Sequence, residues 1–124
     1  MQILIVEDDI IDRRLYAAVI EEQGWQVSLA ENGLQGLKVL SKTTPDVILL
    51  DLLMPRMNGY AFLDEIEKDP VWSKIPVIVM TAKDLSWDDF QQLDRRVRRI
   101  IRKSEPGSIA ELVPAIKSVT TAVN

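Results

Sequence analysis

The sequence predicts an α/β protein built on a doubly wound parallel sheet. The first observation is that short apolar runs such as residues 47–50 lack the alternation of half-exposed strands, which is typical of strands buried on both faces. The second is that strand patterns alternate with helical patterns along the chain, five of each. Parallel strands joined in this way form a doubly wound sheet with right-handed crossovers.

The first part of the chain contains two strand patterns and two helical patterns. Residues 2–6 form an apolar run that ends in acidic residues, and the helical spacing after it ends at Gly24. Residues 25–30 alternate, which predicts a strand with one more exposed face. Asn32 is a suitable cap for the next helix. The core stripe expected in that helix comprises Leu34, Leu37 and Leu40.

The third predicted strand, residues 47–50, ends at a carboxylate, Asp51. An acid has no place inside an apolar strand unless it is paired or functional, and ligands of open α/β sheets gather at the carboxyl ends of strands. In the turn that follows, Pro55 prevents helix continuation and Asn58 supplies a helix cap. The helix after this turn is expected to bury Phe62, Leu63 and Ile66.

The last part of the chain completes the pattern. Residues 75–80 predict a fourth strand, and residues 98–102 predict a shorter fifth strand. Between them, Ser86 begins a helical segment in which Trp87 and Phe90 are expected to anchor the core; exposure of Trp87 would instead suggest a protein interface. The last amphipathic helix contains a proline, which weakens or kinks it unless it marks a late start. Its apolar positions and its proline are Ile109, Leu112, Val113, Ile116, Val119 and Pro114.

Composition excludes several classes of function. With 124 residues, 47% of them hydrophobic, the chain fits one domain over residues 1–124. A net charge of −4 argues against direct nucleic-acid binding, which needs a basic surface. The absence of cysteine excludes thiolate metal sites, and the absence of histidine excludes a Ser-His-Asp triad. Because no apolar run approaches the ~18 residues of a membrane span and no signal peptide precedes the first strand, we expect a cytoplasmic protein without a membrane partner.

Five polar side chains follow the predicted strands and are expected to share one pocket. Glu7 and Asp8 follow the first strand, Asp51 the third, Thr81 the fourth and Lys103 the fifth. Three carboxylates that lie close together raise the pKa of at least one of them unless a cation sits among them. Because an all-oxygen site with open positions favours Mg²⁺, the sequence predicts a magnesium site at this edge.

The same residues suggest a phosphoryl-transfer reaction. Mg²⁺ usually binds alongside phosphate, Lys103 adds a positive charge, and Thr81 adds a hydroxyl donor. Together these groups can hold a phosphoryl group in line with an attacking carboxylate oxygen. Asp51 is the expected nucleophile, and its product is an acyl phosphate.

These residues resemble the receiver domain of two-component response regulators. The segments that carry the resemblance are ILIVEDD at residues 3–9, DVILLDLLMPRMNG at 46–59, IPVIVMTA at 75–82 and IIRKS at 100–104. They occur in the order and at the spacing of that family, and together they cover essentially the whole chain. The resemblance implies a flavodoxin-like sheet with strand order 2-1-3-4-5.

The resemblance also assigns roles to individual residues. It implies that Asp51 is the phosphoacceptor and that Thr81 and Lys103 contact the phosphoryl oxygens. It further implies a Mg²⁺ site in which Asp8 and Asp51 are ligands, Glu7 binds through water and the backbone carbonyl of Leu53 is another ligand. The implied phosphoryl donor is a phosphohistidine on a sensor histidine kinase or a histidine phosphotransfer protein, and the implied output is a downstream protein bound at the face of helix 4, strand 5 and helix 5.

Three departures from the family pattern qualify this comparison. The family usually places proline after its lysine, joined by a cis bond, whereas Ser104 follows Lys103. A cis bond before a residue other than proline costs about 2.5–4 kcal/mol, so we expect a trans bond and a slightly displaced lysine. The family commonly has Tyr or Phe at its switch position, three residues before the lysine, whereas this chain has Ile100. The turn that usually precedes the fifth strand is replaced by residues 93–97. We therefore expect an unusual fourth helix and output surface beside an intact pocket.

Alternative functions remain open at this point. Asp51 alone could be a capping or turn residue, although the other pocket residues argue against that interpretation. A receiver fold that binds partners without phosphorylation is favoured weakly by Ile100 and Ser104. A magnesium-dependent aspartyl-phosphate phosphatase would usually carry a second acid two residues after its nucleophile, where this chain has Leu53.

Further residues have structural and functional interpretations. Asp9 is expected to start a helix in solvent rather than to bind metal, and Trp25 and Trp72 are expected to pack at element ends. A basic cluster near the C-terminal end predicts a solvated, protected edge strand, with a docking surface for an acidic protein as second interpretation and nucleic acid as third. Its members are Arg95, Arg96, Arg98, Arg99, Arg102 and Lys103.

Overall fold

In the computed structural model, which describes residues 1–121, five parallel strands form one sheet in the order β2-β1-β3-β4-β5. The predicted doubly wound α/β fold and its strand order are confirmed. The strands are β1 (Gln2–Val6), β2 (Gln26–Ala30), β3 (Val47–Leu50), β4 (Val77–Thr81) and β5 (Arg99–Arg102). The helices are α1 (Ile10–Glu21), α2 (Gly33–Leu40), α3 (Gly59–Glu67), the 3₁₀ turn η1 (Trp72–Lys74), α4 (Trp87–Leu93) and α5 (Ser108–Thr121).

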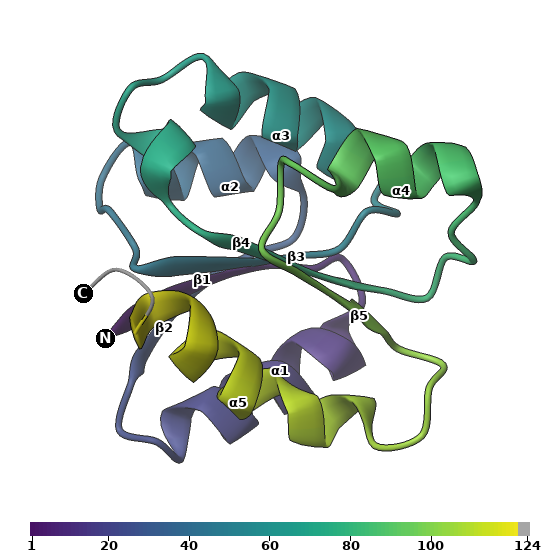
Figure 1. Ribbon diagram of the computed structural model, residues 1–124. Helices are drawn as coiled ribbons and strands as arrows, with labels where there is room; N and C mark the ends of the chain where they lie inside the picture. Colours follow the sequence, from purple (N-terminus) through teal and green to yellow (C-terminus); the bar gives the residue numbers. More distant parts are fainter. Residues whose placement is uncertain (122–124) are drawn as a thin grey trace.

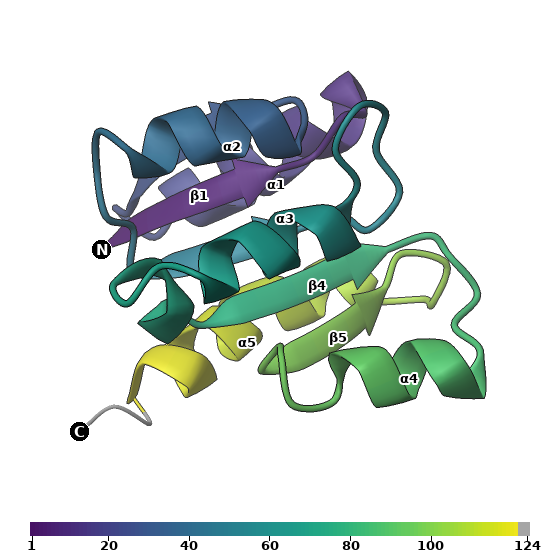
Figure 2. The same ribbon diagram turned by 90° about the horizontal axis from the view of Figure 1, so that it is seen from above.

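Helices cover both faces of the sheet. α1 and α5 lie on one face, while α2, α3 and α4 lie on the other (Figure 1). Successive residues of β1 enter opposite cores: Ile3 and Ile5 pack with α1 and α5, and Leu4 and Val6 pack with α2 and α3. Seen from above, α2, α3 and α4 lie in that order across the sheet (Figure 2).

Side-chain caps start the helices where the sequence predicts. The side chains of Asn32, Asn58 and Ser86 each accept a hydrogen bond from a backbone N–H in the first turn of the following helix. Asp9 does the same for α1, so its predicted position at a helix start is confirmed. Ser86 also forms a reciprocal capping box with Asp89, which defines the start of the short helix α4.

The packing of α2 differs from the prediction. Leu34 is 45% exposed, whereas Gly33 and Gly36 are buried. A Cβ atom at Gly36 would lie 2.8 Å from the ring of Phe62, so α3 approaches the α2 backbone too closely for a larger side chain. Leucine spacing predicts which positions of a helix face inward, but it does not predict how closely the neighbouring helix approaches. Here Gly36, rather than Leu34, faces the ring of Phe62.

The prediction that Trp87 and Phe90 anchor the core is wrong. Trp87 is 75% exposed and Phe90 36% exposed, while Leu93 is fully buried. Leu93, at the end of α4, is the buried residue of this helix, and the aromatic side chains lie at the surface. Trp25 and Trp72 are partly buried against the two cores, as predicted.

The C-terminal part of the sheet matches the prediction closely. β4 starts at Val77 rather than at residue 75 because η1 ends at Lys74 and Ile75 is its C-cap. α5 begins before Pro114 and continues past it, so the proline does not mark a late start. Pro114 lies on the exposed side of α5. Within residues 1–121, no helix is long and apolar enough to cross a membrane.

Candidate functional site

The carboxyl ends of four strands bring the predicted site residues to one edge of the sheet. Val6 of β1 pairs with Leu50 of β3, so the residues that follow these two strands are neighbours. On the other side of β3, Thr81 is the last residue of β4, and its partner in β5 directly precedes Lys103. The parallel register thus places the acids, the hydroxyl and the ammonium together.

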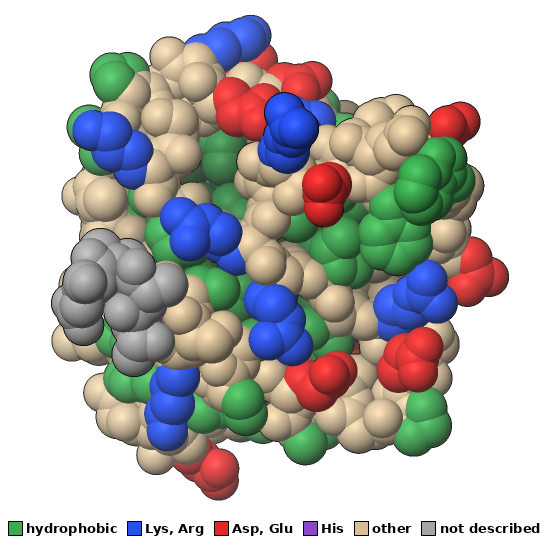
Figure 3. All heavy atoms as spheres, in the orientation of Figure 1, with side chains coloured by type: hydrophobic (Ala, Val, Ile, Leu, Met, Phe, Trp, Pro, Cys, Tyr) green, Lys and Arg blue, Asp and Glu red, His purple; other side chains and the backbone are tan. Residues whose placement is uncertain are grey.

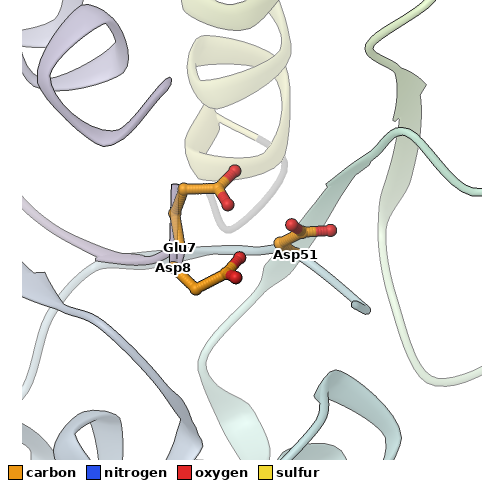
Figure 4. Close-up of side chains that lie close together, drawn as sticks. All are labelled: Glu7, Asp8 and Asp51. Atoms are coloured by element: carbon orange, nitrogen blue, oxygen red, sulfur yellow. The ribbon is translucent and has the colours of Figure 1, made fainter. Parts of the chain in front are cut away.

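Three carboxylates form the centre of the site. Oxygen atoms of Glu7, Asp8 and Asp51 lie within 4.8 Å of one another. Figure 4 shows the side chains of Glu7 and Asp8 at the end of β1, close to Asp51 at the end of β3. Glu7 is 2% exposed and Asp51 6%, whereas Asp8 is exposed. Hard oxygen donors that converge and open to solvent on one side fit a Mg²⁺ ion, which keeps several of its waters.

The ammonium of Lys103 lies against these carboxylates. Its Nζ contacts Glu7 Oε1, lies 3.3 Å from Asp51 Oδ2 and lies 3.0 Å from Asp12 Oδ2. Burial opposes the charged form, but the hydrogen bonds to Glu7 and Asp12 and the charge of Asp51 outweigh it and raise the pKa of Lys103. The Lys103–Ser104 bond is trans, as expected, and the lysine nevertheless reaches the acids.

Glu7 is the most strongly perturbed acid of the site. Burial raises its pKa to about 8, and the neighbouring Asp51 acts in the same direction, whereas Lys103 opposes both. A carboxyl group that is this hard to ionise is expected where a cation normally compensates the charge. A divalent ion at the three acids would return the pKa of Glu7 toward its usual range.

The loop after β3 holds Asp51 in place. Asp51 Oδ1 accepts a hydrogen bond of 3.3 Å from the backbone N–H of Leu53. A Cβ atom at Gly59 would lie 2.7 Å from the carbonyl oxygen of Asp51, so only glycine allows α3 to start so close to the site. Within residues 1–121, Arg56 of this loop is the only residue other than glycine with positive φ, at 65°.

Thr81 ends β4 at the same edge of the sheet as the acids. It is fully buried, and its Oγ1 accepts a hydrogen bond of 3.1 Å from the backbone N–H of Lys83. The ammonium of Lys83 forms an ion pair of 3.1 Å with Asp89 of α4, and Tyr60 donates a hydrogen bond of 2.8 Å to the same Asp89 oxygen. The loop from Thr81 to α4 is therefore fastened to both α4 and α3.

Two residues of the site were missed by reasoning from the sequence. Asp12 contacts Lys103 from the first turn of α1, three residues after the helix cap. Arg13 is buried and donates a hydrogen bond of 2.9 Å to the carbonyl oxygen of Glu7, which supports the backbone of the acid pair. The only indication in the sequence that Asp12 and Arg13 could reach the site was their position in the first turn of the helix that follows Glu7 and Asp8. Asp9 lies outside the carboxylate cluster.

Fold and site together define an α/β signalling domain with an acidic site suited to accept a phosphoryl group. Comparison with known proteins supports this classification. The chain belongs to the response regulator receiver domain family, which matches residues 3–117. The resemblance inferred from the sequence is therefore confirmed, and the chain is a receiver domain of two-component signalling. This family is a regulatory phosphoacceptor domain that binds Mg²⁺ at an acidic site.

Several relatives and solved structures are similar to this chain. It is 40% identical over 87 residues to Protein PilH of Pseudomonas aeruginosa, covering 70% of the chain and 72% of PilH. It is 32% identical over 119 residues to the Response regulator PleD of Caulobacter vibrioides, covering 96% of the chain but only 26% of PleD. It also spans only 42% of the probable transcriptional regulator ycf29 of Pyropia yezoensis.

Solved structures of receiver domains share the fold over nearly the whole chain. The receiver domain of a histidine kinase from Syntrophus aciditrophicus superposes with a TM-score of 0.87 at 31% identity, covering 99% of this chain and 92% of that one. The receiver domain of the sensor histidine kinase PA1611 from Pseudomonas aeruginosa gives 0.85 at 26% identity and covers 97% of both chains. That structure has a magnesium ion coordinated in its active site cleft.

Proposed function

We propose that residues 1–124 form one receiver domain in which Asp51 accepts a phosphoryl group with Mg²⁺ bound at Glu7, Asp8, Asp51 and the carbonyl of Leu53. The observation that carries this proposal is the convergence of three carboxylates within 4.8 Å, with the Lys103 ammonium in contact with two of them. This arrangement pairs a nucleophile with the positive charge that a phosphoryl group needs.

The transfer step follows from the positions of these side chains. An oxygen of Asp51 attacks the phosphorus of a phosphohistidine, a P–O bond forms, the P–N bond breaks, and its electron pair stays on the imidazole nitrogen. Lys103 and the Thr81 hydroxyl then donate hydrogen bonds to phosphoryl oxygens. Mg²⁺ supplies neutralisation of the negative charge on the transferred group. The domain thus assists its own phosphorylation and, with water in place of the imidazole, its own dephosphorylation.

The phosphohistidine donor lies outside these residues, because they contain no histidine. The donor is a sensor histidine kinase or a histidine phosphotransfer protein. The output is a downstream protein that binds the face of α4, β5 and α5. Two exposed aromatic residues of α4, Trp87 and Phe90, support this surface because exposed tryptophan is enriched at interfaces. Figure 3 shows an apolar area over α4 with basic side chains next to it. The exposed apolar area favours a protein partner, and no direct contact with nucleic acid or membrane is proposed.

Two alternatives have less support. An interaction module that works without phosphorylation was suggested by Ser104 and Ile100, but Lys103 keeps its contacts with Asp51 and Glu7 although its bond to Ser104 is trans. An aspartyl-phosphate phosphatase would need a general acid two residues after its nucleophile. Leu53 occupies that position and is 51% exposed, but its apolar side chain has no proton to donate.

The experiment that tests the proposal is intact-protein mass after incubation with Mg²⁺ and acetyl phosphate. Wild type should gain one phosphoryl group, whereas Asp51→Asn should gain none because an amide does not form the acyl phosphate. A folded wild type that gains no mass with Mg²⁺ present would overturn the proposal and leave the interaction module as the better explanation. Gain of mass in both proteins would show that another residue is the acceptor.

A further inference from the structure

Asp12 is the third carboxylate in contact with Lys103, and neither metal binding nor phosphoryl transfer uses it. Its Oδ2 lies 3.0 Å from the lysine Nζ, closer than the 3.3 Å of Asp51 Oδ2. A lysine ammonium has three N–H donors, and each of them faces one carboxylate, those of Glu7, Asp12 and Asp51. A phosphoryl oxygen therefore finds no free donor on Lys103 unless one carboxylate gives up its hydrogen bond.

The three carboxylates differ in how easily water can replace the lysine. The side chains of Glu7 and Asp51 are 2% and 7% exposed, whereas that of Asp12 is 34% exposed. Asp12 also lies outside the cluster of converging oxygens that would hold a metal ion. An exposed carboxylate recovers much of its hydration when its ion pair breaks, so the pair with Asp12 is the weakest of the three.

We propose that Asp12 is a positioning residue that competes with the phosphoryl group for the ammonium of Lys103. In the unphosphorylated domain, Asp12 holds Lys103 toward the start of α1. When Asp51 carries a phosphoryl group, one of its oxygens takes over the N–H donor that Asp12 accepted, and Asp12 turns to solvent. This inference rests on the proposed function, because it requires that Asp51 is the acceptor.

The direction of the effect follows from this competition. Asp12→Asn removes the charge that attracts Lys103, which leaves one ammonium donor available for the incoming phosphoryl group. Because partly exposed ion pairs contribute up to about 1 kcal/mol, we expect phosphorylation by acetyl phosphate to be about three- to fivefold faster. The comparison is made at saturating Mg²⁺, so that a weaker metal site in the variant does not change the rate.

The matched control is Asp9→Asn. Asp9 lies three residues before Asp12, and its substitution removes the same charge from the same helix start without touching Lys103. Asparagine is as good a helix cap as aspartate, so α1 should remain intact. Asp12→Glu restores the charge and should bring the rate back toward wild type. A long-range charge effect would accelerate Asp9→Asn and Asp12→Asn alike.

The rates and a second structure decide the question. Faster phosphorylation in Asp12→Asn, with Asp9→Asn close to wild type, supports the competition. Equal rates in all variants, or a slower Asp12→Asn, would overturn it while the proposed function stands; a wild type that takes no phosphoryl group would overturn both. In a crystal structure with Mg²⁺ and beryllofluoride, Lys103 should contact a fluorine and lie beyond 3.5 Å from Asp12. A retained Asp12 contact would overturn the proposal without reference to any rate.

Discussion

At the scale of single residues, Glu7 connects the site to the stability of the protein. Its pKa is raised from 4.5 to about 8 by burial. Below pH 4.5, the residue is protonated in both the folded and the unfolded chain. Between these two pKa values, Glu7 is ionised in the unfolded chain but still protonated in the folded protein. The contribution of Glu7 to stability therefore falls as the pH rises toward 8.

Glu7→Gln should therefore stabilise the metal-free protein, and more so at pH 8 than at pH 5. We expect a gain on the order of 1–2 kcal/mol in the free energy of unfolding at the higher pH, because the variant no longer has to bury a charge. Urea denaturation at the two pH values measures it. Glu22→Gln changes an exposed glutamate at the end of α1 and should have little effect at either pH. An equal gain at pH 5 and pH 8 would contradict the role of ionisation.

Leu53 is a second residue whose surroundings lead to a prediction. Leu53 lies two residues after Asp51 and is 51% exposed. Lys83, two residues after Thr81, forms an ion pair with Asp89. An apolar side chain at the rim of the site offers no hydrogen bond to a water that attacks the acyl phosphate. We predict slow hydrolysis in wild type and a lifetime several-fold shorter in Leu53→Asn, followed by intact-protein mass after removal of the donor.

The control for Leu53 is Leu34→Asn, which changes another exposed leucine on α2 and should leave the lifetime unchanged. A wild-type half-life of seconds that Leu53→Asn does not alter would refute the prediction.

Sequence reasoning identified the acids and their partners because each directly follows a strand, and parallel strands end at one edge. It missed Asp12 for a physical reason. Whether an acid in the first turn of α1 reaches Lys103 depends on the angle at which the helix leaves the sheet and on the length of the lysine side chain, and neither is encoded in residue spacing. Arg13 was missed because its guanidinium supports the site by donating hydrogen bonds to backbone carbonyl oxygens, which residue spacing does not reveal.

At the scale of elements, α4 is the helix whose position the sequence predicted least well. Its start at Ser86 was correct because a cap is a local feature. The burial of Trp87 was wrong because the helix has only 7 residues, so its orientation is set by Leu93 and by contacts from other elements rather than by an apolar stripe. Asp89 makes those contacts: it accepts hydrogen bonds from Ser86, Tyr60 and Lys83.

Asp89→Ala should loosen α4 while the rest of the fold persists. The variant removes half of the capping box, the acceptor of the Tyr60 hydroxyl and the partner of Lys83 at once. Hydrogen exchange should become faster by tenfold or more in residues 87–93, because a short helix without its cap opens locally, and remain unchanged in α5. Asp88→Ala, an exposed acid in the same turn, is the matched control. Equal exchange in both variants would show that the network does not hold α4.

At the scale of the whole molecule, a cation bound at the site would link the two halves of the sheet. The proposed ligands follow β1 and β3, and a bound ion would hold these strand ends together against the mutual repulsion of Glu7, Asp8 and Asp51. Because this geometry exists only in the folded chain, Mg²⁺ should raise the melting temperature. The expected gain is about 2.7 kcal/mol in stability when Mg²⁺ is a hundredfold above its dissociation constant.

The effect of Mg²⁺ on stability should depend on pH with a defined sign. Since Glu7 must lose its proton to compensate the charge of the ion, and burial raises the pKa of Glu7 to about 8, the stabilisation by a fixed Mg²⁺ concentration should increase from pH 6 to pH 8.5. Thermal denaturation with Mg²⁺ and with chelator measures it. Asp9→Asn should show the full gain, since Asp9 lies outside the cluster, whereas Asp51→Asn should lose most of it. Stabilisation that is the same at both pH values, or that Asp51→Asn retains in full, would place the ion elsewhere and leave Lys103 as the cation that compensates the buried charges of Glu7 and Asp51.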